Sequence, residues 1–250
     1  EIILNLKQVR FKNNLDHVLD MVENGYIYLD SPWNFNDPLD SYGITLLSNE
    51  DNFEKFAFLR NPELKKQSDI AKNTVVFSGT KEKNITNVLM WAHYSGFHRG
   101  VALKYKVPEN IFGELDFVKY ELPDQVRGVF KLMFYKNEDW KYEDEIRYVK
   151  ELEQKKVDNA DACKEYGWEV EEVCLGYNYF KNPDAEKMIK LVDLCEQKGI
   201  KVFIMDYQYD EVSKRFSLKK ITKIASELNT NNYLSENYSI IKKILMNGKK

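Results

Sequence analysis

The sequence has little of what marks membrane, secreted or zinc-binding proteins. Its longest apolar runs, such as the four residues 202–205, end in charged residues, whereas a membrane-spanning helix needs about 20 apolar residues. The first seven residues lack the basic, apolar and small-residue regions of a secretory signal. The three cysteines match neither a disulfide framework nor a zinc pattern. We therefore expect a cytoplasmic protein with no membrane partner and no bound metal.

Apolar residues make up 43% of the 250-residue chain, enough for a sizeable core, which excludes disorder of the whole chain. Charge is uneven. Residues 211–250 carry nine Lys/Arg and three Asp/Glu (net +6), so residues 1–210 carry 28 and 37 (net −9), and the total is −3. An acidic body binds phosphate backbones poorly. Nucleic acid is therefore expected only through the basic tail, whose charges also fit a solvated helix face docked on an acidic surface.

Apolar spacing and breaker residues predict a series of helices and strands. We expect helices over residues 14–24, 50–67, 86–96, 123–135 and 184–198, with Thr86 as an N-cap and with Gly25 and Gly199 as stops. We expect strands over residues 26–30, 73–78, 100–105, 116–120, 141–149, 168–175 and 201–205. The last strand, helix and strand predict one parallel crossover. The predicted class is α+β: a single domain over 1–226, with a central mainly antiparallel sheet flanked by helices, and a C-terminal helical extension over 227–250.

The first segment with candidate chemistry is the loop from Ser31 to Asp40. It holds two prolines, two asparagines and two aspartates in ten residues, a composition typical of a structured loop. Its apolar members are expected to anchor it in the core. Asn36, Asp37 and Asp40 fit either of two roles, capping turns or contacting a ribose or a phosphate-bound cation.

The second segment, Met90 to Gly100, places two of the three histidines beside aromatic residues. His93 and His98 are five residues apart, which is not the spacing of a zinc-binding helix. A functional interpretation makes Trp91 and Tyr94 an aromatic wall for a planar base and His93 a donor to a phosphate or ribose oxygen. The structural alternative is a helix-to-strand junction with His93 hydrogen-bonded in the core. His98 is the weaker candidate of the two.

The third segment is the alternating stretch 141–149, which predicts Glu143, Glu145 and Arg147 on one strand face. Two carboxylates about 6 to 7 Å apart repel unless a cation such as Arg147 neutralises them. The structural alternative is an ion-pair network at a strand edge. The functional alternative is a glutamate aimed into a cleft, either with a raised pKa for acid–base work or ionised to stabilise positive charge. We expect the three segments to converge on one cleft.

Four phrases, taken in order, resemble a bacterial family called domain of unknown function 2971: Tyr28 to Asp40, Phe77-Ser78, Met90 to Gly100 and Trp140 to Arg147. The resemblance extends from about residue 8 to about residue 220 and includes Leu175-Gly176. It implies no particular reaction. Because some members are encoded near phage-defence genes, it implies a toxin or an antiphage-defence effector.

A second likeness is to toxin-type ADP-ribosyltransferases, which use an Arg or His, then a Ser, Thr or Tyr, then a Glu on successive strands. The matching residues, in order, are Arg10, then Ser78 or Tyr28, then Glu143 and Glu145. The likeness implies that NAD is a substrate, and we expect an NAD- or nucleotide-directed enzyme that is either ADP-ribosyltransferase-like, with a protein or nucleic-acid acceptor, or glycohydrolase-like. Glu145 would stabilise the oxocarbenium ion formed at the ribose, and Ser78 would orient it. Arg10 would pair with the pyrophosphate or the adenosine ribose, and the nicotinamide pocket would be lined by Trp91, His93 or Tyr94.

Two other classes remain open. A metal-dependent nuclease or phosphodiesterase would gather Asp37, Asp40, His93, Glu143 and Glu145 around a hard cation. A non-catalytic sensor would hold a nucleotide or a phage-derived protein without reacting. The aromatic content of 14% is rich enough to supply a stacking or protein-binding surface for such a sensor.

Overall fold

A computed structural model describes residues 7–35, 37, 40–43, 71–121, 129–153, 163–221 and 241–247. The chain groups into two compact units. Unit 1 comprises residues 1–26, 81–107 and 167–250, and unit 2 comprises residues 27–80 and 108–166. The helix predicted over 50–67, the candidate Asn36 and the proposed boundary at 226–227 all lie outside the described residues.

Unit 1 is built on five strands in the order β10, β9, β8, β4, β1. Their bounds are β1 (Lys7–Lys12), β4 (Val101–Lys106), β8 (Glu169–Leu175), β9 (Lys201–Asp210) and β10 (Arg215–Ile221). Strands β8 and β9 pair in parallel, and the other neighbours pair antiparallel. Helix α7 (Ala185–Lys198) joins β8 to β9, so the predicted crossover is confirmed.

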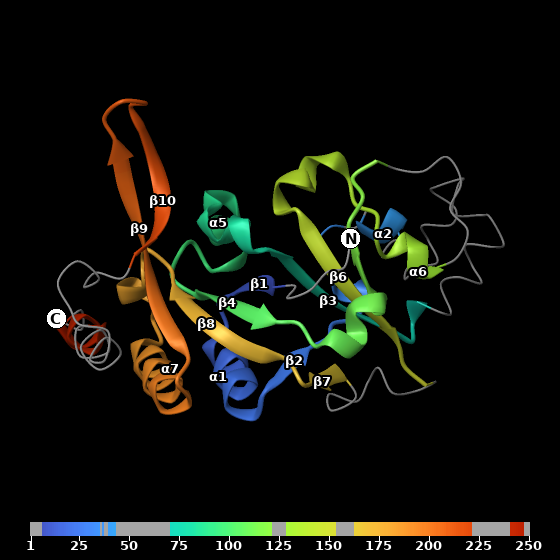
Figure 1. The fold of residues 1–250 in the computed structure, drawn as a ribbon, viewed down its shortest axis with the longest axis horizontal. Helices are drawn as coiled ribbons and strands as arrows, with labels where there is room; N and C mark the ends of the chain where they lie inside the picture. The colour runs from blue at the N-terminus through green and yellow to red at the C-terminus, as the bar shows by residue number, and fades with distance from the viewer. Residues whose placement is uncertain are drawn as a thin grey trace. The chain divides into compact units, whose positions relative to one another are not determined.

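Three helices cover the two faces of the unit 1 strands. Helices α1 (Leu15–Asn24) and α7 lie side by side on one face, and α5 (Val88–Tyr94) lies on the other (Figure 1). Both predicted glycine stops are confirmed, because Gly25 and Gly199 adopt the left-handed conformation that ends a helix.

The predicted N-cap of α5 is wrong by one residue. The Asn87 side chain accepts from the Leu89 amide at 3.0 Å. Thr86 instead ends the short helix η4 (Glu82–Thr86), where its hydroxyl donates to the Lys83 carbonyl. Both residue types cap helices well, and the preceding turn decides between them.

Unit 2 holds three antiparallel strands in the order β3, β6, β5: β3 (Thr74–Lys81), β6 (Glu145–Glu151) and β5 (Leu115–Phe117). Strands β2 (Tyr26–Tyr28) and β7 (Lys164–Tyr166) form a separate pair. Short helical turns fill the connections: η1 (Pro32–Asn34), α2 (Asp40–Gly43), η5 (Glu109–Glu114), α6 (Val129–Leu132) and η6 (Glu138–Glu143).

The strand predicted over 141–149 is wrong in its first half. Residues 138–143 form η6, and Asp144 has a left-handed φ of 46°, so β6 begins only at Glu145. Aspartate tolerates this conformation better than most residues. The period-two charge pattern therefore runs across a helical turn and a strand, and Glu143 lies in η6 instead of on the strand with Glu145 and Arg147.

The predicted α+β class is confirmed, with a mainly antiparallel sheet and flanking helices. A helix over residues 241–247 is present in the region of the expected C-terminal extension. The helix predicted over 123–135 is described only from residue 129 and forms the single turn α6. Within the described ranges, no helix is both long enough and apolar enough to cross a membrane.

Two loops of unit 1 are joined by backbone hydrogen bonds. The Gly176 amide donates to the Gly100 carbonyl, and the Asn178 amide donates to the His98 carbonyl, both at 2.9 Å. The first of these loops is strained, because Gly96, Phe97 and His98 have φ values of 59°, 59° and 65°. Tight contact with the second loop holds it in this conformation.

Gly176 makes this contact possible. A Cβ on Gly176 would lie 2.3 Å from the carbonyl oxygen of His98. We expect Gly176→Ala to lower the free energy of unfolding by about 1–3 kcal/mol, because the two backbones must separate. Gly113→Ala is the control, since a Cβ there meets nothing within 4 Å, and it should change stability by about 0.5 kcal/mol or less. Urea unfolding measures both variants, and equal effects would show that the contact is unimportant.

Candidate functional site

The side chain of Arg147 is the centre of a buried charge cluster in unit 2. Its Nη1 and Nη2 donate to the two carboxylate oxygens of Asp40, each at 2.8 Å. Its Nε and Nη2 donate to the two oxygens of Glu145 at 2.7 and 3.0 Å. A further bond runs from Nη1 to the Met133 carbonyl at 2.6 Å, and the Phe35 ring lies 4.9 Å from the guanidinium carbon. The guanidinium therefore joins the loop segment to the strand segment.

Lys136 completes the cluster from the other side. Its ammonium donates to Glu143 at 2.6 Å and lies 3.5 Å from Glu145 and 3.6 Å from Asp40. The Trp140 ring centroid is 4.6 Å from the same ammonium. Among the described residues, three carboxylates thus surround two cations, and these five side chains together carry one formal negative charge. Because the five charged residues are all at most 5% exposed, water compensates this charge poorly.

Glu145 is ionised in this environment. Burial alone would raise its pKa, but the charges of Arg147 and Lys136, with hydrogen bonds from Arg147 and Ser78, lower the pKa to about 2. Burial also opposes the charged form of Arg147, yet the carboxylates of Glu145 and Asp40 raise the pKa of Arg147. For Glu145, these charges favour the ionised alternative over the acid–base one with a raised pKa.

The structure brings two of the three predicted segments together. Asp40 and Glu145 share Arg147, and Ser78 bonds to Glu145 from β3. Glu143 reaches the same cluster through Lys136. Asp37 and Tyr28 lie in unit 2 and are half-buried.

The candidates of the second segment lie in unit 1. Trp91 is fully buried, and its Nε1 donates to the Ile85 carbonyl at 2.7 Å. His93 is exposed and Tyr94 is half-buried. Arg10, the first residue of the likeness to ADP-ribosyltransferases, lies in β1 of the same unit and is half-buried. Convergence of all three segments on one cleft stays a prediction, because His93 and Glu145 belong to different units.

A second candidate site in unit 1 is an aromatic pocket of about 410 Å³. Eight side chains line it: Tyr177, Tyr179, Phe180, Ile204, Met205, Asp206, Ile221 and Ile244. The parallel pairing of β8 with β9 ends at Leu175 and Ile204, so the pocket lies just past the carboxyl end of β8. Ligands commonly bind at the carboxyl ends of parallel strands.

A row of rings supports the pocket wall. Tyr177 packs edge-on against Tyr207 at 5.0 Å, and Tyr207 lies 6.1 Å from the ring of His98. His98 in turn stacks on Trp91 at 6.3 Å. Burial lowers the pKa of His98, and its Nδ1 is buried with no hydrogen-bond partner in the described structure. The second segment thus approaches the pocket through His98 rather than through His93.

The sequence analysis did not identify the pocket residues or Lys136. Tyr177, Tyr179 and Phe180 form an aromatic run directly after Leu175-Gly176, and this run was the available signal. Asp206 stands at the end of an ordinary strand pattern, and Lys136 follows an apolar stretch. Nothing in their immediate neighbours distinguishes these two residues, because the fold brings their partners to them: Asp40 to Lys136, and Tyr177 and Ile244 to the pocket that Asp206 lines.

Comparison of the chain with protein-family models, with curated proteins and with solved structures finds no match in any of the three. The resemblance to family 2971 and the likeness to ADP-ribosyltransferases therefore stay predictions. In the part of the chain that the structure describes, no group of three His, Cys, Asp or Glu side chains is arranged to hold a metal ion.

The charge balance of the cluster predicts a large effect for its central residue. We expect Arg147→Met to lower the free energy of unfolding by about 3–5 kcal/mol, because three buried carboxylates would remain with Lys136 alone. Lys150→Met is the control: its partner is Glu165, and its side chain is 38% exposed, so the loss should be about 1 kcal/mol or less. Chemical unfolding of both variants measures the difference. A mild Arg147→Met variant would mean that the cluster contributes little to stability.

Proposed function

We propose that this chain is a nucleotide-binding protein, with NAD or a related dinucleotide as its ligand, and that it acts as a sensor in antiphage defence. The observation that carries the proposal is the aromatic pocket of unit 1. Its volume of about 410 Å³ falls within the usual range for small-molecule sites. The exposed rings of Tyr177 and Phe180 offer stacking surfaces for a planar base, with the buried Tyr179 between them in the sequence. Stacking on aromatic side chains is a common way to hold bases.

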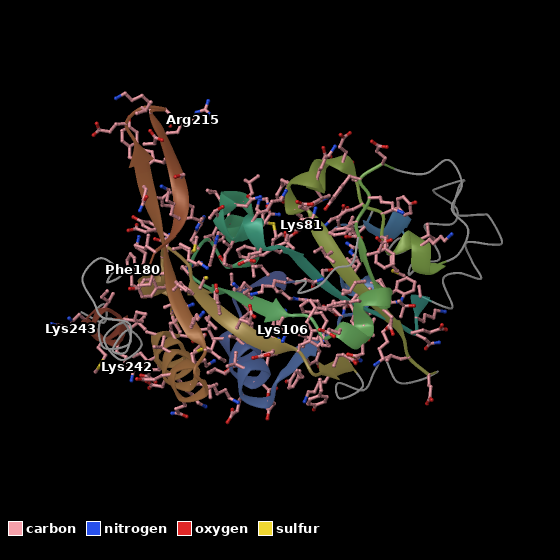
Figure 2. All side chains as sticks on the ribbon, in the orientation of Figure 1. Lys81, Lys106, Phe180, Arg215, Lys242 and Lys243 are labelled. Atoms are coloured by element: carbon pink, nitrogen blue, oxygen red, sulfur yellow. The ribbon has the colours of Figure 1, made fainter. Side chains whose placement is uncertain are left out.

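Two exposed lysines suit the phosphates of such a ligand. Lys181 directly follows the lining residue Phe180, and Lys243 directly precedes the lining residue Ile244. Figure 2 labels Phe180 together with Lys242 and Lys243 on the same side of unit 1. Lys242 is engaged by Asp193, whereas Lys181 and Lys243 are exposed. A phosphorylated ligand is therefore favoured over a free base.

The β9–β10 hairpin supports a sensing role over a purely catalytic one. Its base contributes Met205, Asp206 and Ile221 to the pocket, and its far end extends past the other strands of unit 1 (Figure 1). The far end exposes Val212 (96%) and Phe216 (72%). Exposed apolar groups of this kind mark protein-binding surfaces, and a two-stranded ribbon is only marginally stable alone. Ligand at the base would order a surface for a protein partner at the far end.

The proposal predicts ligand-dependent stability. NAD at 100 times its dissociation constant should add about 2.7 kcal/mol of stability and raise the melting temperature, with ADP-ribose, ATP and GTP as the comparison panel. The double variant Lys181→Ala/Lys243→Ala should weaken binding about threefold to tenfold through lost phosphate contacts. Lys106→Ala, at an exposed position at the end of β4, should leave affinity unchanged. The absence of any shift across the panel would refute nucleotide binding.

A second candidate function is cleavage of NAD by the charge cluster of unit 2. The specific observation in its favour is the hydrogen bond from Ser78 to an ionised Glu145, as the likeness to ADP-ribosyltransferases implies. An ionised carboxylate in a cluster with excess negative charge suits an oxocarbenium ion. Both oxygens of Glu145 are already bound by Arg147, so a substrate must replace one of these contacts. This access requirement places the candidate second.

Nicotinamide release from NAD tests the second candidate. If Glu145 is catalytic, Glu145→Gln should reduce the rate at least about a hundredfold, because an amide cannot stabilise developing positive charge. Glu165→Gln, which removes a partly exposed carboxylate paired with Lys150, should keep the parental rate. Folding of both variants is checked by circular dichroism. Parental activity in a folded Glu145→Gln protein would restrict the cluster to a structural role.

A further inference from the structure

The lining of the unit 1 pocket has an unusual balance of chemistry. Three of its eight side chains are aromatic, four are aliphatic, and the single charged one is the carboxylate of Asp206. Aromatic faces carry negative potential and attract organic cations, most strongly when the cation sheds its water. We infer that the pocket selects a planar organic cation, such as the N-alkylated pyridinium ring of oxidised nicotinamide. This inference rests on the proposed function, which it deepens by naming the charge of the group that enters the pocket.

The lining rings lie at steep angles to their aromatic neighbours. Tyr179 is nearly perpendicular to Phe180 at 87°, and Tyr177 is nearly perpendicular, at 76°, to Tyr207, which lies outside the lining. A planar cation can therefore stack on one ring face while another ring meets its edge. Phe180 shows the same preference toward the protein itself, since the ammonium of Lys181 lies 5.5 Å from its ring centroid.

The carboxylate of Asp206 is available to a bound cation. Its Oδ1 accepts from the Tyr207 amide at 2.9 Å, and no ion-pair partner for Asp206 occurs among the described residues. Lys219 stands opposite Asp206 in the β9–β10 register but is exposed and makes no such pair. Asp206 is half-buried, so a bound cation would gain a direct ion pair with it, whereas a neutral ligand would not.

The nearby lysines do not cancel this preference. Lys220 donates to Glu172 at 2.7 Å and lies over the Phe203 ring. Lys242 is paired with Asp193. Each of these two cations is therefore paired with a carboxylate of its own. Lys181 and Lys243 are exposed and adjoin lining residues in the sequence, and we assign them to the phosphates of a dinucleotide.

Calorimetric titration of the full chain tests this selection with two matched ligand pairs. 1-Methylnicotinamide, a cation because its ring nitrogen is methylated, should bind about tenfold more tightly than neutral nicotinamide. NAD in its oxidised form should likewise bind more tightly than NADH, whose ring is neutral. Tetramethylammonium serves as a cation without a planar ring and should bind more weakly than 1-methylnicotinamide, because it cannot stack.

Three variants locate the preference. Asp206→Asn and Tyr177→Leu should each reduce the tenfold ratio to about threefold or less, since the first removes the charge and the second removes a ring while keeping apolar bulk. Glu211→Gln, which removes an exposed carboxylate of the same hairpin outside the pocket lining, should keep the full ratio. Retention of the ratio in Asp206→Asn and Tyr177→Leu would place the cation elsewhere and overturn the inference.

The ligand pairs also separate failure of the inference from failure of the proposed function. Equal affinity for the oxidised and reduced dinucleotide would overturn charge selection but leave nucleotide binding intact. Binding of tetramethylammonium, with no binding of 1-methylnicotinamide or NAD, would overturn both the planar ligand and the dinucleotide. The absence of binding by every compound would overturn the proposed function and the inference together.

Discussion

One guanidinium organises unit 2. Arg147 directs its donors to Asp40 in α2, to Glu145 in its own strand and to the Met133 carbonyl after α6. Removing these charges from water costs several kcal/mol per ion, and only such complete pairing repays it. A planar fork can satisfy two carboxylates at once, which a lysine ammonium cannot do with the same geometry. The positions of the loop, the strand and the turn therefore depend on this side chain.

Unit 1 uses a different constraint, close contact between backbones. The carbonyls of His98 and Gly100 receive amide hydrogen bonds from the loop that carries Tyr177. The contact needs glycine at position 176, since a Cβ would collide with the His98 carbonyl. It also holds Phe97 and His98 in a left-handed conformation that neither residue prefers. The aromatic wall of the pocket thus stands on a fixed backbone and not on charge pairing.

The two sites differ most in how many hydrogen bonds their carboxylates already accept from the protein. Both oxygens of Glu145 accept hydrogen bonds from Arg147, and Ser78 donates a further one. The carboxylate of Glu145 is therefore already bound within the protein. Asp206 accepts only from the neighbouring amide among the contacts described and lines an open cavity. A carboxylate that has few hydrogen-bond donors and lies beside aromatic rings can accept a bond from a ligand. A carboxylate whose oxygens are all hydrogen-bonded within the protein stabilises the fold instead. This contrast is why we propose ligand binding at the unit 1 pocket and keep catalysis at the cluster as the second candidate.

The sequence by itself determined the local elements of this protein. Gly25 and Gly199 end their helices as predicted, and the crossover from β8 through α7 to β9 follows from apolar spacing. These features depend on residues within one or two turns of each other. The same local reading was wrong at 141–149, where charges alternate across a helical turn before the strand begins. The period of the charge pattern alone cannot distinguish a continuous strand from a helical turn followed by a strand. A residue in the left-handed conformation, such as Asp144, interrupts the strand without changing the pattern.

Only the tertiary structure decided which side chains contact one another in the charge cluster and in the pocket. That Arg147 belongs to Asp40 as well as to Glu145, that Lys136 joins them, and that Tyr177 faces a cavity with Asp206 are contacts between residues far apart in the chain. A buried charge takes whichever opposite charge the fold brings within about 4 Å, because desolvation penalises every other arrangement. Residue spacing along the chain carries no measure of that distance.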